Sequence, residues 1–166
     1  AYNILDDFAY VCGQDTFTAG FFAPGFIDQY GMNVIVIDSF DWTNRVGEDL
    51  NDYAGVIGHE LEHLQHNYSD PGELSWVDEG LADMAAFLNG YDMTGSHLTY
   101  QQVFHRETSL TRWGGGLENY GASFSYFAYL WEQAGGNGGG SLTPDLQYDE
   151  TAGDQVVKLI FAEHAN

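Results

Sequence analysis

The segment HELEH, residues 59 to 63, has residue types and a spacing that suit metal chemistry. Residues i and i+4 share one face of a helix, so the imidazoles of His59 and His63 can bind one Zn²⁺ ion. Glu60 follows the first histidine and is turned away from it, so its carboxylate can reach a water molecule beside the metal. This H-E-x-x-H pattern is typical of zinc hydrolases in which the glutamate is the general base.

A catalytic zinc site needs a third protein ligand. His66 lies seven residues beyond His59. That distance is about 10 Å along a helix axis, too far for both residues to bind one ion. We expect His66 at the surface or in support of the ligands, and Glu62 in solvent. Glu79 is the better third ligand, because a second helix after the turn SDPG can return it to the histidine pair.

Two aspartates near Glu79 have different expected roles. Asp83 lies one helical turn further along the same face. It can accept a hydrogen bond from the non-ligating nitrogen of a zinc histidine and so fix the tautomer of that ring. Asp78 is expected on another face, where it forms a capping box with Ser75.

Apolar spacing predicts the helices that must hold these side chains. Apolar residues recur at helical spacing from Leu50 to Leu64, with Asp49 or Asn51 as candidate N-caps. The segment NYSDPG ends this helix. A second helix is expected from Ser75 to Leu88, where Asn89-Gly90 ends it.

The rest of the chain predicts a small sheet and further helices. MNVIVID, residues 32 to 38, predicts a short buried strand. Residues 91 to 119 show no regular pattern, a third helix is expected from Tyr120 to about Ala134, and a last one starts near Asp154. A helix is only hinted at over residues 2 to 11. Together these elements predict a single α+β domain over residues 1 to 166, mainly helical, with a small sheet near the N-terminal half.

The charge is strongly negative, at −21, with four Lys plus Arg against twenty-five Asp plus Glu. Such a surface repels phosphate backbones and anionic membranes, so neither nucleic acid nor a membrane is an expected partner. Apolar residues make up 44% of the chain, which favours a globular protein over a disordered acidic tail. We expect an extracellular, secreted protein, and a salt-adapted source would give the same composition.

Other features give weaker indications. Cys12 is the sole cysteine, so no disulfide can close within the chain. The chain begins at Ala1 without a charged and apolar leader, which fits a processed protein or an excised domain, and its end falls inside an expected helix. The loop DLQYDETAGD, residues 145 to 154, could hold Ca²⁺ through its carboxylates, but it lacks the EF-hand spacing, and a solvated loop is favoured.

The remaining histidines have no partners at ligand spacing. His97, His105 and His164 are expected at the surface or in ordinary hydrogen bonds. His105 with Arg106 could assist oxyanion stabilisation if their loop folds over the site.

The histidine pair followed by Glu79 and Asp83 resembles the pattern of gluzincin zinc peptidases. The pattern is similar in outline to that of thermolysin-like proteases and of zinc aminopeptidases, with a slightly shorter gap between His63 and Glu79. The segments GHELEHLQHNY and LSWVDEGLAD are most similar to those of hyicolysin-like secreted bacterial metallopeptidases. The likeness runs from about Thr18 to Gly136 and is firmest over residues 59 to 83. It implies a zincin-like fold around a two-helix zinc site.

The segment YGASFSYFAYLWEQAGG, residues 120 to 136, resembles an aminopeptidase helix that opens with a tyrosine. In that family the tyrosine donates a hydrogen bond to the oxyanion, and the resemblance implies this role for Tyr120. The competing interpretation is that Tyr120 is an aromatic packing residue. Tyr126 and Tyr129 are expected in the core.

The resemblance also bears on substrate binding. Zinc aminopeptidases place a Gly-x-Met-Glu-Asn strand before the histidines, and its glutamate binds the substrate amine. Gly31-Met32-Asn33 has no such glutamate, which favours cleavage inside chains. Asn33 and Val34 could still pair with an extended substrate by strand addition.

The sequence therefore predicts a secreted zinc endopeptidase acting on protein or peptide substrates. His59, His63 and Glu79 are the expected ligands of one catalytic Zn²⁺, Glu60 is the base, and the roles of Tyr120 and Asp83 are as above. The alternatives are an aminopeptidase, a zinc-stabilised binding or adhesion module without activity, and a metal-free helical domain whose motif is accidental.

Overall fold

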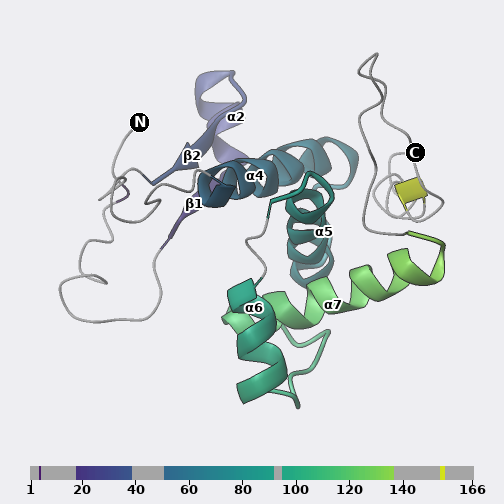
Figure 1. Ribbon diagram of the computed structural model, residues 1–166. Helices are drawn as coiled ribbons and strands as arrows, with labels where there is room; N and C mark the ends of the chain where they lie inside the picture. Colours follow the sequence, from purple (N-terminus) through teal and green to yellow (C-terminus); the bar gives the residue numbers. More distant parts are fainter. Residues whose placement is uncertain (1–3, 5–17, 39–50, 92–94, 137–153, 156–166) are drawn as a thin grey trace.

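The computed structural model describes residue 4 and residues 18–38, 51–91, 95–136 and 154–155 (Figure 1). These residues are mostly helical with a small antiparallel sheet, so the coarse α+β prediction is confirmed. The main elements are strands β1 (Gly20–Phe22) and β2 (Ile35–Ile37), helices α2 (Gly25–Tyr30), α4 (Asn51–Ser69), α5 (Ser75–Leu88), α6 (Gly95–Thr99) and α7 (Leu117–Gln133), and the π-helix η1 (Tyr100–Phe104).

The sheet lies against one side of α4. β1 and β2 pair antiparallel, with Gly20 opposite Ile37 and Phe22 opposite Ile35, and both strands contact α4. The strand predicted over residues 32 to 38 is shorter in the structure, and its side chains are only half-buried. Antiparallel sheets commonly pack one face on the core and leave the other solvated, which fits the partial burial.

Helix α5 lies between α4 and α7 and provides half of the apolar core (Figure 1). A Cβ added to Gly80 would lie 2.6 Å from a ring carbon of Phe127 and 3.0 Å from Cβ of Ser123, so α5 and α7 approach closely at this glycine. The buried core cluster consists of Val77, Leu81 and Met84 from α5 and Phe124, Phe127 and Trp131 from α7.

Helix α4 buries an unusual set of side chains. Its existence was predicted from apolar spacing, and the structure describes it over Asn51–Ser69. Yet Ile57 and Leu61, two of the apolar residues that gave the pattern, are each 43% exposed. Polar side chains take the inward positions instead: His59, Glu60, Glu62 and His66 are all buried. Charged groups are almost never fully buried unless they are paired, so this face of α4 points to a site.

One helix has the predicted bounds but not the predicted cap, and another begins earlier than predicted. Helix α5 begins at Ser75, with Leu74 before it and no side-chain capping bond, so the predicted capping box of Ser75 and Asp78 is wrong. Helix α7 begins at Leu117, ahead of the predicted Tyr120, which places the tyrosine in the first turns of the helix.

The stretch from 91 to 119 is more regular than predicted, because it contains α6 and η1. The prediction that Tyr126 and Tyr129 lie in the core is also wrong, since they are 39% and 58% exposed. Tyr126 contacts the rings of Trp76 and Phe127 at the edge of the core, and an aromatic residue in a helix pattern does not by itself show how deeply it is buried.

Some predictions concern residues outside the described ranges. These are the helix hinted at over residues 2 to 11, Cys12, the Asp49 cap, His164 and nearly all of the calcium loop and the last helix. Among the helices that the structure describes, none combines the length and the apolar character needed to cross a membrane.

Candidate metal centre

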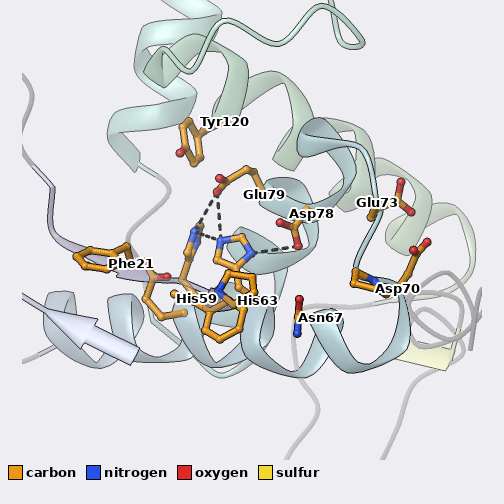
Figure 2. A pocket seen from close by; sticks show the side chains of 14 residues that line it. Phe21, His59, His63, Asn67, Asp70, Glu73, Asp78, Glu79 and Tyr120 are labelled. Carbon is orange, nitrogen blue, oxygen red and sulfur yellow. Dashed lines mark hydrogen bonds and ion pairs between the residues drawn. The ribbon is translucent and has the colours of Figure 1, made fainter. Parts of the chain in front are cut away.

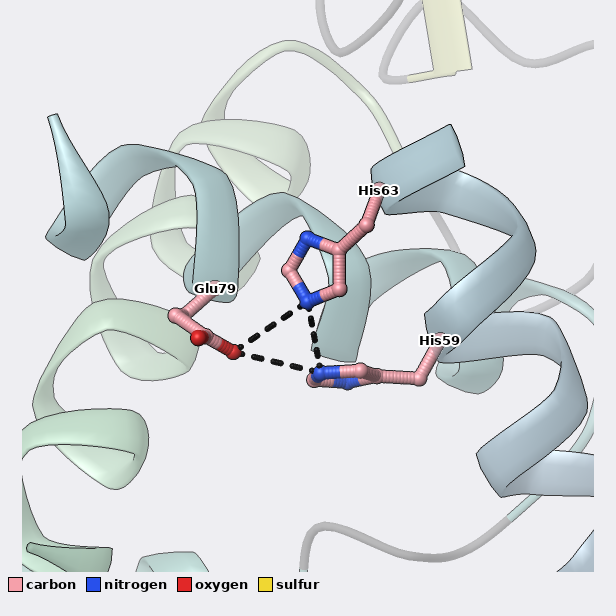
Figure 3. Close-up of side chains that lie close together, drawn as sticks. All are labelled: His59, His63 and Glu79. Atoms are coloured by element: carbon pink, nitrogen blue, oxygen red, sulfur yellow. Dashed lines mark hydrogen bonds and ion pairs between the residues drawn. The ribbon is translucent and has the colours of Figure 1, made fainter. Parts of the chain in front are cut away.

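Three side-chain atoms from α4 and α5 form a small triangle (Figure 3). Nε2 of His59 lies 3.1 Å from Nε2 of His63 and 3.2 Å from Oε2 of Glu79, and the third edge, from His63 Nε2 to Glu79 Oε2, is 3.4 Å. Tetrahedral zinc, with bonds of about 2.0–2.1 Å, places its ligand atoms about 3.3 Å apart. The triangle therefore has the size of one face of a zinc tetrahedron, and the residues fit the ion.

The two helices produce this triangle by simple means. His59 and His63 are one turn apart on α4, with ring centroids 4.7 Å apart and ring planes at 83°. After a short turn, α5 crosses α4 and brings Glu79 over the ring pair (Figures 1 and 3). The two helices are in direct contact near Gly58, where the Cα of Ala86 would lie at an ordinary van der Waals distance of 3.7 Å from an added Cβ.

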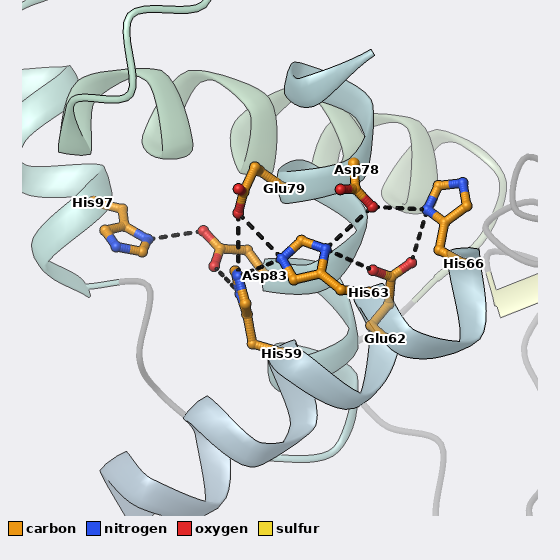
Figure 4. A network of polar contacts seen from close by, with 8 residues as sticks. All are labelled: His59, Glu62, His63, His66, Asp78, Glu79, Asp83 and His97. Carbon is orange, nitrogen blue, oxygen red and sulfur yellow. Dashed lines mark hydrogen bonds and ion pairs between the residues drawn. The ribbon is translucent and has the colours of Figure 1, made fainter. Parts of the chain in front are cut away.

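Asp83 orients the first histidine. Its Oδ1 lies 3.0 Å from Nδ1 of His59, and its Oδ2 lies 2.8 Å from Nδ1 of His97 (Figure 4). An ionised carboxylate only accepts hydrogen bonds, so both ring nitrogens donate to it. When the ring is neutral, the lone pair of His59 is therefore on Nε2, where it can bind a metal. His97 was not predicted here, because it lies in another helix with no fixed spacing to the motif.

The second histidine has its own set of partners (Figure 4). Oδ1 of Asp78 lies 3.1 Å from Nδ1 of His63 and 3.2 Å from Nδ1 of His66. Glu62 lies 3.7 Å from the first of these nitrogens and 3.3 Å from the second. The expectations for Glu62 and Asp78 are therefore wrong: Glu62 is buried, not solvated, and Asp78 faces the histidines instead of capping α5. His66 is outside the triangle, as expected, but only 2% exposed.

A second group of potential metal ligands, Glu62, His63 and Asp78, shares His63 with the triangle. A neutral imidazole has one lone pair and one N–H group, so it can bind a metal through only one nitrogen. With Nε2 of His63 in the triangle, Nδ1 carries the hydrogen and faces the Asp78 carboxylate, 3.1 Å away, as an ion-pair partner. The second group then supports the triangle instead of forming a site of its own.

The carboxylates make the centre strongly attractive to positive charge. Burial favours a neutral His59, but hydrogen bonds to Asp83 and Glu79 outweigh burial and raise the pKa of His59 to about 9. Burial of His63 is likewise outweighed by Asp78 and Glu79, and its pKa rises to about 11. Burial disfavours an ionised Glu79, but the two imidazoles outweigh it and lower its pKa. A bound metal ion would balance the negative charge of these carboxylates in place of the protons on the histidines.

The triangle opens into a cavity of about 310 Å³ (Figure 2). Glu60 lines this cavity together with the triangle and is itself buried. Burial raises the pKa of Glu60, against the opposing effect of the two nearby histidines. A carboxylate with a raised pKa beside an open metal position has the location and the basicity of a general base. Residues from β1, α7 and the turn between α4 and α5 complete the wall, among them Phe21, Tyr120, Asp70 and Glu73.

Tyr120 reaches the cavity from α7 and faces the triangle (Figure 2). Its ring centroid lies 6.4 Å from that of His59 and 5.0 Å from those of His97 and Trp113. Burial raises the pKa of Tyr120, and the negative charges of Glu79 and Asp83 raise it further. The phenol therefore keeps its proton near neutral pH and can donate a hydrogen bond. The ring of Tyr120 also packs against aromatic neighbours. Its surroundings therefore fit both roles considered from the sequence, the oxyanion donor and the packing residue.

The two residues that were expected to bind substrate lie outside the cavity wall. Asn33 and Val34 are not among the cavity-lining residues, and Oδ1 of Asn33 instead accepts a hydrogen bond of 2.5 Å from the hydroxyl of Tyr68. The strand that lines the cavity is β1, which pairs with β2 and contributes Gly20, Phe21 and Phe22 to the wall.

The segment with His105 and Arg106 does not fold over the site either. His105 stacks on Tyr100 with centroids 6.4 Å apart, and Nε of Arg106 donates to the carbonyl of Gln102. Neither residue lines the cavity.

Comparison with known proteins gives no family. No protein-family model matches the chain, and no curated protein or solved structure matches it. The gluzincin resemblance thus stays a prediction from the motif, and the geometry of the centre is what bears on function.

Proposed function

We propose that this chain is a secreted zinc-dependent peptidase of gluzincin type with a zincin-like fold, and that it cleaves peptide bonds inside protein or peptide chains. The observation that carries the proposal is the triangle of His59 Nε2, His63 Nε2 and Glu79 Oε2, with edges of 3.1 to 3.4 Å. Its size suits tetrahedral zinc, and it faces a cavity. An accidental motif on a solvated helix would not bury these polar groups together.

Zinc held by this triangle would make water more acidic and polarise a substrate carbonyl. The chain's own residues supply the remaining chemistry. Glu60 accepts the proton from the attacking water and passes it to the leaving amine. Tyr120 donates a hydrogen bond to the oxyanion as negative charge develops. Asp83 holds His59 in the tautomer that presents Nε2.

The cavity wall supports a peptide substrate. β1 lines the cavity, and among the described residues it pairs with β2 along one edge only. Its other edge can form main-chain hydrogen bonds with an extended substrate, a role the sequence assigned to Asn33 and Val34. The strongly acidic composition fits the secreted location that we propose.

An aminopeptidase is the second candidate, and one observation favours it. Asp70 and Glu73 line the same cavity, and either carboxylate could bind the free amine of a substrate (Figure 2). Peptides with free and with acetylated N-termini separate the two activities. Faster cleavage of acetylated peptides at internal bonds supports the endopeptidase, and cleavage restricted to free N-termini supports the aminopeptidase.

The deciding experiment combines metal content with activity. We expect the purified chain to hold one zinc per molecule by elemental analysis. We also expect it to cleave denatured casein, to lose this activity with a chelator and to regain it with Zn²⁺. Zinc without cleavage would indicate a binding or adhesion module, and neither zinc nor cleavage would indicate an accidental motif.

A further inference from the structure

The carboxylate of Asp83 is shared by two imidazoles. One oxygen accepts from Nδ1 of His59 at 3.0 Å and the other accepts from Nδ1 of His97 at 2.8 Å (Figure 4). Asp83 is 0% exposed, so no water reaches either oxygen directly. The rotamer of Asp83 is therefore set from two sides, and the shorter of the two bonds comes from His97.

His97 also contacts the tyrosine of the cavity. Its ring centroid lies 5.0 Å from that of Tyr120, with the planes at 34°, and Trp113 contacts the same tyrosine ring at 5.0 Å. Two aromatic neighbours at this distance restrict the side-chain rotation of Tyr120. One imidazole thus touches both the carboxylate that orients a ligand and the phenol that faces the cavity.

The backbone holds His97 in this place. The carbonyl oxygen of His97 lies so close to Gly121 that a Cβ added there would overlap it, so α6 packs directly on the backbone of α7. His97 is largely buried, and its position follows from this close helix contact.

We propose that His97 is a positioning residue that couples metal retention to oxyanion stabilisation. Its Nδ1–H group holds Asp83 in the rotamer that serves His59, and its ring holds Tyr120 toward the cavity. The part that concerns Tyr120 rests on the proposed peptidase function. The part that concerns the metal rests on Asp83 and the triangle alone.

Two variants separate these contacts. His97→Phe keeps an aromatic ring beside Tyr120 but removes the donor to Asp83. We expect its zinc affinity, measured by competition with a chromogenic chelator, to fall about 10- to 100-fold. His97→Asn keeps an N–H donor in reach of Asp83 but removes the ring. We expect its zinc affinity within about threefold of the wild type and its kcat about tenfold lower, with KM little changed.

A double variant and a matched control complete the test. If His97 acts through Tyr120, the loss in kcat from His97→Asn should disappear in a Tyr120→Phe background, because the hydroxyl it positions is gone. His105→Phe and His105→Asn are the controls, since His105 lies outside the cavity, and both should match the wild type. Thermal unfolding of each metal-free variant identifies any that does not fold. If His97→Phe does not fold, the proposal is tested with His97→Asn.

Each outcome has a distinct meaning. Wild-type zinc affinity in His97→Phe, or an equal loss from His97→Asn with and without the Tyr120 hydroxyl, would overturn the coupling while leaving the peptidase proposal intact. A wild-type chain that binds no zinc would overturn both. A chain that binds zinc without cleaving would overturn the peptidase proposal and the proposed role of His97 toward Tyr120. The zinc affinity of His97→Phe would still decide the role of His97 toward Asp83.

Discussion

Asp78 Oδ1 lies 3.1 Å from Nδ1 of His63, on the side of the ring away from the nitrogen that faces Glu79. Asp78 and Glu79 are neighbours in sequence, and both contact the same imidazole, each at a different nitrogen (Figure 4). Adjacent residues in a helix point about 100° apart, which lets them meet the ring from two directions. One turn of α5 therefore supplies both the candidate ligand Glu79 and Asp78, the carboxylate that orients the imidazole of His63.

Removing Asp78 should weaken both the metal site and the fold. In Asp78→Ala, His63 and His66 lose the carboxylate with which both form ion pairs, and we expect zinc affinity to fall about tenfold. The free energy of unfolding should fall by about 1–3 kcal/mol, toward the lower end because Asp78 is partly exposed. Chelator competition and urea unfolding measure the two effects. Asp78→Asn keeps an acceptor oxygen and should lose less of each; equal losses in both variants would argue against the orienting role.

Glu60→Gln should separate metal binding from catalysis. Glutamine cannot accept the proton, so we expect kcat to fall about 10³-fold while zinc content stays at the wild-type level. The measurement is casein hydrolysis together with elemental analysis. Glu132→Gln, at an exposed position on α7, is the matched control and should behave as the wild type. Wild-type hydrolysis by the Glu60 variant would rule out the proposed mechanism.

Glu79→Ala should reduce metal retention. The triangle then keeps only two ligand atoms, and a third is needed for a catalytic zinc site. We expect most of the zinc to be lost on dialysis against a weak chelator under conditions in which the wild type keeps it. Glu118→Ala, in the first turn of α7, is a control that removes a carboxylate outside the cavity. If the Glu79 variant keeps its zinc, Glu79 is not a ligand.

Zinc affinity should rise with pH. The metal-free pKa values of His59 and His63 are raised to about 9 and about 11, so both rings favour the protonated form at neutral pH. Zinc binds only the unprotonated nitrogens, so protons compete with it until the pH passes these values. We expect apparent affinity to increase between pH 6 and pH 9, by up to about tenfold per pH unit for each displaced proton. Calorimetry in buffers of different ionisation enthalpy counts the released protons, and no release would contradict the raised pKa values.

Gly80→Ala should destabilise the core. The added Cβ would lie 2.6 Å from a ring carbon of Phe127, in a region where α5 and α7 are in direct contact. Overpacking of this kind costs about 1–3 kcal/mol, which chemical denaturation can measure. Gly58→Ala is the matched control in a neighbouring helix, because its added Cβ would be 3.7 Å from the nearest atom. Equal stability of the two variants would show that Phe127 moves aside freely.

Several features of the site could be predicted from local rules. His59 and His63 share a face because helical geometry fixes the direction of residues four apart. The short turn after α4 limits where α5 can lie, which brings Glu79 and Asp83 back toward the histidines. The exclusion of His66 as a ligand followed from the reach of a single ion, a distance argument that needs no tertiary structure.

Other features depended on contacts between distant segments. Apolar spacing predicted α4 but not which side is covered, because Ile57 and Leu61 face outward while the polar face meets α5. β1 and not β2 lines the cavity, since strand order is decided by how the hairpin sits on α4. No spacing rule relates His97 to Asp83.

The sequence by itself determined which residues could act as ligands and base, because these depend on helix periodicity and on side-chain chemistry. Only the tertiary structure decided the charge partners: Asp78 and Glu62 for the second histidine, and His97 for Asp83. The physical reason is that such partners meet through the crossing of α4 with α5 and the docking of α6 on α7. Those arrangements follow from packing of the whole core, and no local pattern encodes them.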